Sequence, residues 1–397
     1  MTNAMCPDRQ RGAGPLRVLV APDSFKGSLG AVEVAARIAA GVRSAVPDSI
    51  VTEAPMADGG EGTALAVATA LDGVWDTVAA IDANGVLIDV PFAVCSSAHL
   101  GAFAIFDVAE IVGLHAATNP PGLRSTRGVG QAIRAIRSLG HKRIVLGLGG
   151  SSTNDGGAGM LAELLFNFVD TAGARVVPVF NNLARIDAVE FRDDRHWLSE
   201  LELMGLTDVG SPLTGPCGAS MVFGAQKGFA DLEQADRLLQ GLAQRCDALV
   251  ATPCADVEGA GAAGGLGYGI CLLGGKLSSG ARFVLDALHL TDGNVNYDWI
   301  ITGEGRSDRQ TLLGKAPALV AQLARSAKIP VTLLSGAVDY DAALEEAFDG
   351  CFSVQSGPVT LEYAMNHAAP LLEAASRQLS TLFVRTGLRQ WSDGAAH

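Results

Sequence analysis

The sequence predicts an α/β protein whose outer domain is a flavodoxin-like, doubly wound parallel sheet, interrupted by an inserted second, mixed α/β domain. Two observations support this fold class. Near both ends of the chain, short apolar and β-branched runs alternate with Ala-rich helical segments, which is typical of buried parallel strands connected by helices. Between these parts, a long middle segment shows the alternation and turn residues of antiparallel strands.

The N-terminal part of the chain contains two units of strand, loop and helix. The first unit begins with the apolar run at residues 16–21. The polar turn that follows ends at Ser28, whose hydroxyl is expected to cap a helix that runs to about Val46. The second unit consists of a strand at residues 49–54, a loop at 55–62 and a helix at 63–71.

The C-terminal part repeats this alternation and completes the outer sheet. Its strands are short and apolar, as expected for a sheet that helices cover on both faces. The expected segments are a strand at 299–302 with a helix to about Ser326, a strand at 330–334 with a helix at 342–347, and a strand at 351–354 with a helix to about Phe383.

The middle part is expected to form a mixed sheet of its own. Residues 75–81 and 86–90 flank the turn sequence Asp-Ala-Asn-Gly and predict a β-hairpin. Further strands are expected at 102–109, 143–148 and 201–207, and a helix at 128–139. The predicted organisation is a flexible tail at 1–14, an outer domain formed by 15–74 and 291–385, and an inserted domain at 75–290, with the active cleft between the two domains.

The composition argues against several classes of protein. With 48% hydrophobic and 18% charged residues, the chain of 397 residues can form an extensive core. Its 29 Lys and Arg residues against 42 Asp and Glu residues give a net charge of −13, which repels nucleic acid and anionic membranes. No apolar run suits a signal peptide or a membrane-spanning helix, and the 7 scattered cysteines form no C-x-x-C pair. These features favour a cytoplasmic protein with buried thiols and with no nucleic-acid or membrane partner.

Clusters among the 48 glycines mark the loops in which we expect ligands to bind. In the loop at residues 21–28, Asp23, Ser24 and Lys26 precede the start of a helix. Free amides, the helix dipole and the ammonium group can point there at one phosphate or carboxylate. A solvated capping turn is the alternative interpretation.

The loop at residues 55–63 places two carboxylates among three glycines. Asp58 and Glu61 are candidate Mg²⁺ ligands, and either could act as a base. Favourable electrostatics at the start of the following helix would explain the same residues without a ligand.

The loop at residues 147–159 gives the strongest indication of function. Three hydroxyl residues, an Asn and an Asp lie among six glycines, directly after an apolar strand. Ordering such a segment costs much conformational entropy, which is expected where backbone amides must approach a ligand closely. The candidate phosphate-binding residues here are Gly149, Gly150, Ser151, Ser152, Thr153 and Asn154.

Two further loops differ in the strength of their signal. The loop at 259–269 matches G-x-G-x-x-G, but no strand comes directly before it, so we interpret its glycines as close helix packing. The loop at 302–315 combines Glu304 with Arg306 and Lys315, a set of charges that can hold phosphates together with a metal ion. A solvated surface loop would not require Gly-Glu-Gly at the end of a strand, so we favour a functional interpretation.

Several common catalytic motifs are absent from the sequence. There is no P-loop, because Gly314 and Lys315 are followed by Ala316 and not by Ser or Thr. Neither a G-x-S-x-G nucleophile elbow nor a local Cys and His signature occurs. Several anion-binding loops rich in acidic residues suggest instead phosphoryl transfer from a nucleotide with Mg²⁺, in which catalysis is mainly positioning and charge neutralisation.

Six segments resemble the bacterial type I glycerate kinase family, in family order from about Arg17 to Leu382. Six long motifs in one order are far more specific than any single glycine loop. The segments are APDSFKGSL at 21–29, PMADGGEGT at 55–63, GLGGSSTNDGGAGM at 147–160, GPCGASMVFGAQKG at 215–228, GAGAAGGLGYG at 259–269 and ITGEGRSDRQTLLGKAP at 301–317.

The resemblance implies ATP- and Mg²⁺-dependent phosphorylation of D-glycerate at the 2-hydroxyl, which gives 2-phosphoglycerate and ADP. It also implies a flavodoxin-like domain with an inserted α/β domain. D-Glycerate and ATP are then the expected partners of a monomer or homodimer. A kinase for another small hydroxy acid, a GHMP-type kinase, a nicotinamide-dependent dehydrogenase and a non-catalytic hydroxy-acid-binding protein stay open as alternatives.

Transfer to a hydroxyl requires an acceptor for its proton, and an Asp is a usual choice in kinases. Asp208, Asp155 and Asp58 are the candidates, and we favour Asp208 because the end of a strand is more rigid than a glycine loop. Asp208 as a turn residue before Pro212 is the alternative. The expected roles are Asp208, Asp155 and Lys26 in catalysis, Asp23, Ser24, Lys26 and Asp58 in substrate binding, Asp58 and Glu61 as metal ligands, and Glu304, Arg306 and Lys315 with the 149–154 loop at the nucleotide.

Overall fold

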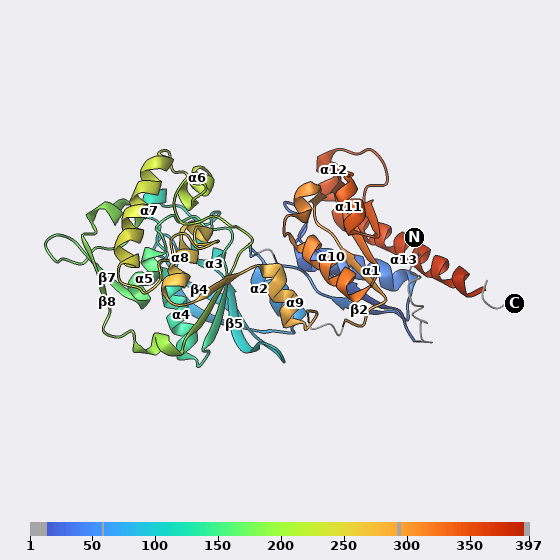
Figure 1. The fold of residues 1–397 in the computed structure, drawn as a ribbon, viewed down its shortest axis with the longest axis horizontal. Helices are drawn as coiled ribbons and strands as arrows, with labels where there is room; N and C mark the ends of the chain where they lie inside the picture. Colours follow the sequence, from blue (N-terminus) through green and yellow to red (C-terminus); the bar gives the residue numbers. More distant parts are fainter. Residues whose placement is uncertain (1–13, 58, 292–294, 393–397) are drawn as a thin grey trace, which may run out of the picture.

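The computed structural model describes residues 14–57, 59–291 and 295–392, with side chains up to residue 386. The expected tail at residues 1–14 therefore lies, except for Gly14, outside the described residues. Two large sheets with their own helices form the two bodies of the molecule seen in Figure 1.

The first sheet is parallel throughout and confirms the expected doubly wound fold. Its strand order is β15-β13-β11-β1-β2, which is the flavodoxin order when the strands are counted along the chain. Alternate residues of β1 face opposite sides, because Leu19 belongs to one core cluster and Val18 and Val20 belong to another. The strands are β1 (Arg17–Val20), β2 (Ile50–Glu53), β11 (Trp299–Thr302), β13 (Val331–Ser335) and β15 (Gly350–Ser353).

Helices cover both faces of this sheet. On one face, Trp299 of β11 stacks on Phe383 of α13 with ring centroids 4.5 Å apart. The first helix starts later than expected, at Ala31, because the Ser28 hydroxyl donates to the Met365 carbonyl at 2.6 Å and does not cap it. One face carries α1 (Ala31–Ala45) and α13 (Ala368–Ser392), the other carries α2 (Thr63–Ala70), α9 (Gly280–Ala287) and α10 (Ala316–Ala327), and α11 (Ala342–Ala347) and α12 (Leu361–Asn366) complete this body.

The second sheet is mixed, as expected. Its order is β10-β9-β6-β5-β4-β3. The predicted hairpin is confirmed, since β3 and β4 pair antiparallel across the turn, and from β5 to β10 the neighbouring strands run parallel. The strands are β3 (Val74–Ile81), β4 (Leu87–Ser97), β5 (Gly101–Asp107), β6 (Arg143–Gly147), β9 (Glu202–Leu206) and β10 (Lys276–Ser278).

The second body also contains elements that were not predicted from the sequence. A small hairpin of β7 (Phe166–Val169) and β8 (Ala188–Phe191) is one of them. The helices are α3 (Ala109–Val112), the expected α4 (Arg127–Ser138), α5 (Ala158–Leu164), α6 (Ala219–Phe223), α7 (Leu232–Asp247) and α8 (Leu266–Leu272), with short 3-10 turns η4 (Ala225–Lys227) and η5 (Ala262–Gly264) among them.

One hydrophobic cluster joins the two sheets. Phe103 and Val145 of the second sheet belong to the same cluster as Leu19 of the first. Helices α2 and α9 lie between the two bodies (Figure 1), and Phe283 of α9 packs edge-on against Phe103 with ring centroids 5.4 Å apart. This shared core fixes the position of one sheet relative to the other. The division of the chain at residues 74 and 290 stays a prediction.

The glycines of the 259–269 loop serve close packing, which confirms our interpretation of this segment. A Cβ atom on Gly264, whose φ is +67°, would lie 1.9 Å from the Thr153 carbonyl oxygen. A Cβ atom on Gly265 would lie 2.4 Å from the Gly156 Cα. The segment therefore packs directly against the 147–159 loop.

Candidate active site

A first pocket lies at the carboxyl end of the parallel sheet, where doubly wound folds place their ligands. The loops after β1, β11 and β15 contribute Lys26, Glu304 and Gln355, and the pocket has a volume of about 910 Å³. One wall is apolar and comes from the segment between β15 and α13, namely Val354, Pro358, Val359, Leu361, Ala364 and Met365.

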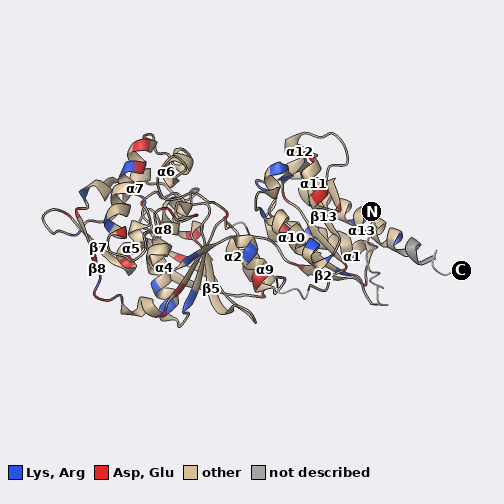
Figure 2. Cartoon of the chain, viewed as in Figure 1, with Lys and Arg blue, Asp and Glu red and all other residues tan. Residues whose placement is uncertain are grey.

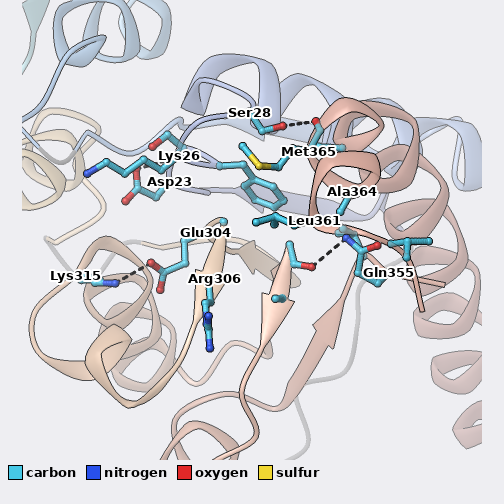
Figure 3. A pocket seen from close by; sticks show the side chains of 18 of the residues that line it. Asp23, Lys26, Ser28, Glu304, Arg306, Lys315, Gln355, Leu361, Ala364 and Met365 are labelled. Carbon is cyan, nitrogen blue, oxygen red and sulfur yellow. Dashed lines mark hydrogen bonds and ion pairs between the residues drawn. The ribbon is translucent and has the colours of Figure 1, made fainter. Parts of the chain in front are cut away.

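The opposite side of this pocket contains the expected residues of the 21–28 loop. Asp23, Ser24 and Lys26 all line the pocket, and Figure 3 shows Asp23 and Lys26 projecting from this loop. The Ser24 amide donates to Asp23 Oδ1 at 2.6 Å, which fixes the turn. The bond from Ser28 to Met365 holds the same loop against α12.

Glu304 organises the 302–315 loop. This residue is only 7% exposed, and its carboxylate accepts hydrogen bonds from Thr311 Oγ1 at 2.6 Å and from Lys315 Nζ at 3.1 Å. The Lys315 side chain is 42% exposed and also lines the pocket. A carboxylate repels a phosphate, so this geometry suits Glu304 to positioning Lys315 and makes Lys315 the candidate phosphate contact of the pair.

Arg306 also lines the first pocket, but its guanidinium is engaged by a carboxylate. Its guanidinium donates to Asp339 Oδ2 at 2.6 Å, and its side chain is 68% exposed. Figure 3 shows this side chain extending away from Asp23 and Lys26. The structure therefore brings Arg306 to the same pocket as Lys315 and Lys26, with its guanidinium already paired to Asp339, and its role at the nucleotide stays a prediction.

A second pocket of about 740 Å³ adjoins the first and faces the second body. It is lined by Gly59 to Gly62, by the 148–151 segment that follows β6, and by Thr207 to Val209 after β9. Both pockets are lined by Ser24, Lys26, Ser28 and Asp208.

Asp208 is the carboxylate, among the described residues, that lines both pockets. It lies two residues beyond the end of β9 and is exposed to solvent. The neighbouring Val209 amide donates to Thr207 Oγ1 at 3.1 Å, which restricts the turn that presents Asp208. The position agrees with the favoured expectation for a base, and the role itself stays a proposal.

The 147–159 loop divides into an exposed part and a buried part. Gly149 contacts the glycine loop before α2 so closely that a Cβ atom would lie 2.2 Å from the Gly60 Cα. Behind it, Ser152 Oγ donates to the Val112 carbonyl at 2.9 Å, a structural contact. Of the expected phosphate-binding residues, Gly149, Gly150 and Ser151 line the second pocket, whereas Ser152, Thr153 and Asn154 are buried and line neither pocket.

Asp155 lies outside both pockets, which argues against its expected role as a base. Its side chain is fully buried and accepts bonds from the Thr126 amide and hydroxyl at 3.0 and 2.8 Å and from the Gly157 amide at 3.1 Å. Burial raises the pKa of Asp155, while these donors act in the opposite direction. The carboxylate thus ties the start of α4 to the start of α5, and sequence spacing alone could not reveal that contact.

Asp107 holds the 59–62 loop in the same way, and it was not predicted from the sequence. Its two carboxylate oxygens accept from the Gly62 and Ala64 amides at 2.9 and 3.0 Å, at the start of α2. Burial raises its pKa to about 7, and the negative charges of Glu110 and Glu61 act in the same direction. Asp107 therefore anchors the loop that contains Glu61.

The expected magnesium ligands can be placed only in part. Glu61 is exposed and lines the second pocket, whereas Asp58 lies outside the described residues. Within the described part of the chain, no three His, Cys, Asp or Glu side chains form a metal cluster. Mg²⁺ commonly binds to one or two carboxylates together with substrate phosphates, so Glu61 near Asp208 fits a cation that arrives with a nucleotide.

Lys227 lines the second pocket but was not predicted as a site residue, although it lies in segment 215–228, which resembles the family. It lines the second pocket from η4 and is 4% exposed. Its Nζ donates to Ser151 Oγ at 3.0 Å and to the Thr153 carbonyl at 2.8 Å. The sequence feature that could have identified it is a single lysine between Gln226 and Gly228.

Charged residues are distributed over both bodies of the molecule. Figure 2 shows Lys and Arg interspersed with Asp and Glu on both bodies. No helix in the described ranges is both long enough and apolar enough to cross a bilayer.

The doubly wound body, the glycine loops and the lysines around adjoining pockets define a protein of the small-molecule phosphotransferase class. Residues 18–384 match the model of the glycerate kinase family. The chain belongs to the glycerate kinase family. It is therefore an enzyme of the class that transfers phosphate to an alcohol group.

Curated relatives and a solved structure agree with this assignment. The chain is 36% identical over 373 residues to a glycerate kinase of Bacillus subtilis, covering 92% of this chain and 97% of the relative. It is 33% identical, over the same shares, to the glycerate 2-kinase of Escherichia coli K12. A crystal structure assigned to glycerate kinase 2 of Salmonella typhimurium LT2 superposes with a TM-score of 0.80 at 33% identity, covering 95% of this chain and 100% of that one.

Proposed function

We propose that this enzyme transfers the γ-phosphate of ATP to the 2-hydroxyl of D-glycerate and forms 2-phosphoglycerate and ADP. The observation that best supports this reaction is the position of Asp208 and Lys26 where the two pockets adjoin. The name of the Escherichia coli relative, glycerate 2-kinase, supports the choice of hydroxyl.

ATP is assigned to the first pocket and glycerate to the second. The apolar wall from Val354 to Met365 suits a purine ring, and Lys26 and Lys315 lie on the polar side, where they can neutralise phosphates. The second pocket, with its glycine loops and Lys227, suits a small polar anion.

The chemical step follows from this arrangement. The 2-hydroxyl oxygen forms a bond to the γ-phosphorus while the bond to the ADP oxygen breaks, and the hydroxyl proton passes to the Asp208 carboxylate. Lys26 lies on the path of the transferring group and neutralises its charge. Mg²⁺, held by Glu61 and by Asp58, would supply further charge neutralisation at the phosphates.

A coupled assay of ADP release tests the reaction. D-Glycerate, hydroxypyruvate, tartronate and homoserine are offered with ATP, and we expect turnover with D-glycerate that chelation of Mg²⁺ abolishes. A different preferred acid would indicate another hydroxy-acid kinase, and binding without ADP release would indicate a non-catalytic binding protein. Reduction of hydroxypyruvate with NADH would indicate a dehydrogenase.

A second measurement tests the position of transfer. Enolase consumes 2-phosphoglycerate, so adding it directly to the reaction products should give phosphoenolpyruvate without a mutase. Product that requires phosphoglycerate mutase first would show transfer to the 3-hydroxyl.

We also propose, from composition alone, a cytoplasmic location and no nucleic-acid partner.

A further inference from the structure

Lys227 is a buried lysine at the wall of the second pocket. Its side chain is 4% exposed, and its Nζ donates to one hydroxyl and one carbonyl oxygen, those of Ser151 and Thr153. An ammonium group has three N–H donors. Within the described part of the chain, these two neutral acceptors are the hydrogen-bond partners of Nζ.

The surroundings of Lys227 contain a second cation and a carboxylate that is already engaged. The Arg124 guanidinium donates to the carbonyls of Lys227 and Ser152 at 3.0 and 3.2 Å. Asp155 is the carboxylate that acts on Lys227, but its oxygens accept bonds from Thr126, Gly157 and Gly159. No ion pair joins Lys227 to any carboxylate among residues 14–57, 59–291 and 295–386.

This environment disfavours the charged lysine in the absence of a ligand. Burial lowers the pKa of Lys227 to about 7, Arg124 acts in the same direction, and Asp155 acts against them. A buried amine without a counterion is therefore about half protonated near neutral pH. An anion at this wall of the pocket would restore the charge.

Ser151 supplies a second donor at the same place. Its Oγ accepts the bond from Lys227, which leaves its own O–H to donate, and Ser151 lines the same pocket. The adjacent Gly149 and Gly150 let the backbone approach a ligand closely. A compact anion can thus receive Lys227 and Ser151 together.

We propose that Lys227, with Ser151, binds the carboxylate of the hydroxy-acid substrate in the second pocket, and that this binding takes up a proton. The proposal rests on the proposed function, because it assigns the acid to this pocket. A carboxylate is favoured over a nucleotide phosphate because the apolar wall suited to a purine lies in the first pocket. A phosphate at Lys227 is the alternative that the experiment distinguishes.

Calorimetry on the unmodified enzyme tests the proton uptake. D-Glycerate is titrated at pH 8 in two buffers of different ionisation enthalpy, and the difference gives the protons taken up. Because the pKa of Lys227 is lowered to about 7 in the free enzyme, we expect uptake of most of one proton at pH 8 and much less at pH 6. Titrations with a non-hydrolysable ATP analogue and with inorganic phosphate should show no comparable uptake. Proton uptake with the ATP analogue or phosphate but not with glycerate would overturn the proposal. The absence of proton uptake with all three ligands would overturn it as well.

A variant gives the second readout. Lys227→Met removes the charge but keeps an unbranched chain, and it should raise the KM for glycerate by about 30-fold or more while the KM for ATP changes little. Lys276→Met, at an exposed lysine of β10, is the matched control and should leave both values unchanged. If the unmodified enzyme uses glycerate and Lys227→Met has a normal KM for glycerate, the proposed role of Lys227 is refuted and the proposed function stands. Failure of the unmodified enzyme to use glycerate would overturn the proposed function as well.

Discussion

Asp208 occupies the position at which one carboxylate can serve two ligands. It lines both pockets, and so does Lys26, whose charge can stabilise the transferring phosphoryl group. A base must reach the substrate hydroxyl, and an exposed turn at the end of a buried strand can present it there without strain.

Replacing Asp208 by Asn should therefore affect turnover far more than binding. The amide cannot accept the proton, so we expect kcat to fall by about two to four orders of magnitude. ATP affinity, measured by calorimetry or by fluorescence of a nucleotide analogue, should stay nearly unchanged. Asp89→Asn, at an exposed position of β4, makes the same chemical change away from the cleft and should keep normal kcat. Near-normal turnover in Asp208→Asn would remove this residue from the role of base.

Residue types were predictable at the cleft, but the partners of each side chain were not. The sequence placed Lys26 and Asp208 in loops after strands, and the structure puts both at the cleft. Asp155 was a second candidate for the base on sequence, but Thr126, 29 positions away, donates to its carboxylate in the core. A contact between residues so far apart in the sequence depends on how α4 packs on α5, and no local sequence pattern predicts that packing.

At the scale of elements, buried carboxylates hold the starts of two short helices beside the cleft. Asp107 accepts from two amides at the start of α2, and Asp155 does so at the start of α5. Both helices follow glycine loops that gain little from intrinsic helix propensity. The carboxylates therefore fix the loops from which Glu61 and Gly149 reach the second pocket.

Asp107 should make stability fall as pH rises. Burial raises the pKa of Asp107 from its ordinary value of 3.8 to about 7 in the folded protein, so the folded state binds more protons between these values. The free energy of unfolding should then decrease by up to about 1.4 kcal/mol per pH unit from pH 4 to pH 7.

Urea denaturation of the unmodified enzyme and of Asp107→Asn across this range measures that contribution. The variant cannot ionise at this position, so the difference between the two free energies should change with pH in the stated direction. Parallel pH profiles would show that the two amide donors already stabilise the ionised form fully.

The close contact between the 259–269 and 147–159 loops predicts a loss of stability when a side chain is added there. Gly264→Ala places a Cβ atom 1.9 Å from the Thr153 carbonyl and keeps a φ of +67° that side chains disfavour. We expect a loss of about 3 kcal/mol or more, because the backbone itself must move. Gly140→Ala has a φ of +100° but open space around it, and should cost about 1–2 kcal/mol. Equal losses, measured by denaturant midpoints, would show that φ alone determines the cost.

Local sequence patterns predicted many of the helices and strands, and others were not predicted. The strand at β11 and the helix at α11 lie where apolar runs and periodicity place them. Helix α7 has a helical period of buried residues behind its Asp231 cap, but it was not predicted from the sequence. The hairpin of β7 and β8 and helix α8, in contrast, lie where glycines and mixed polarity obscure any period. Tertiary packing decides structure there, as in the core cluster that Phe166 shares with Leu239 and Tyr268.

At the scale of the whole molecule, the net charge of −13 contrasts with the local cations of the cleft. Lys26, Lys227 and Lys315 line its two pockets, so an anionic substrate meets positive charge only after it reaches the cleft. The same shared core that links the sheets holds these lysines in their places, because α2 and α9 pack against both bodies.

This shared core leads us to expect one cooperative unfolding transition instead of two. Proteins with separate cores commonly unfold domain by domain, whereas here Leu19, Phe103 and Phe283 belong to one buried cluster. Scanning calorimetry should give a calorimetric enthalpy close to the van't Hoff enthalpy. Phe283→Ala should destabilise the whole transition by about 3–5 kcal/mol, whereas Phe191→Ala, at a residue 36% exposed on β8, should shift it much less. Two resolved transitions, or a loss in Phe283→Ala confined to one of them, would show that the two bodies are stable independently.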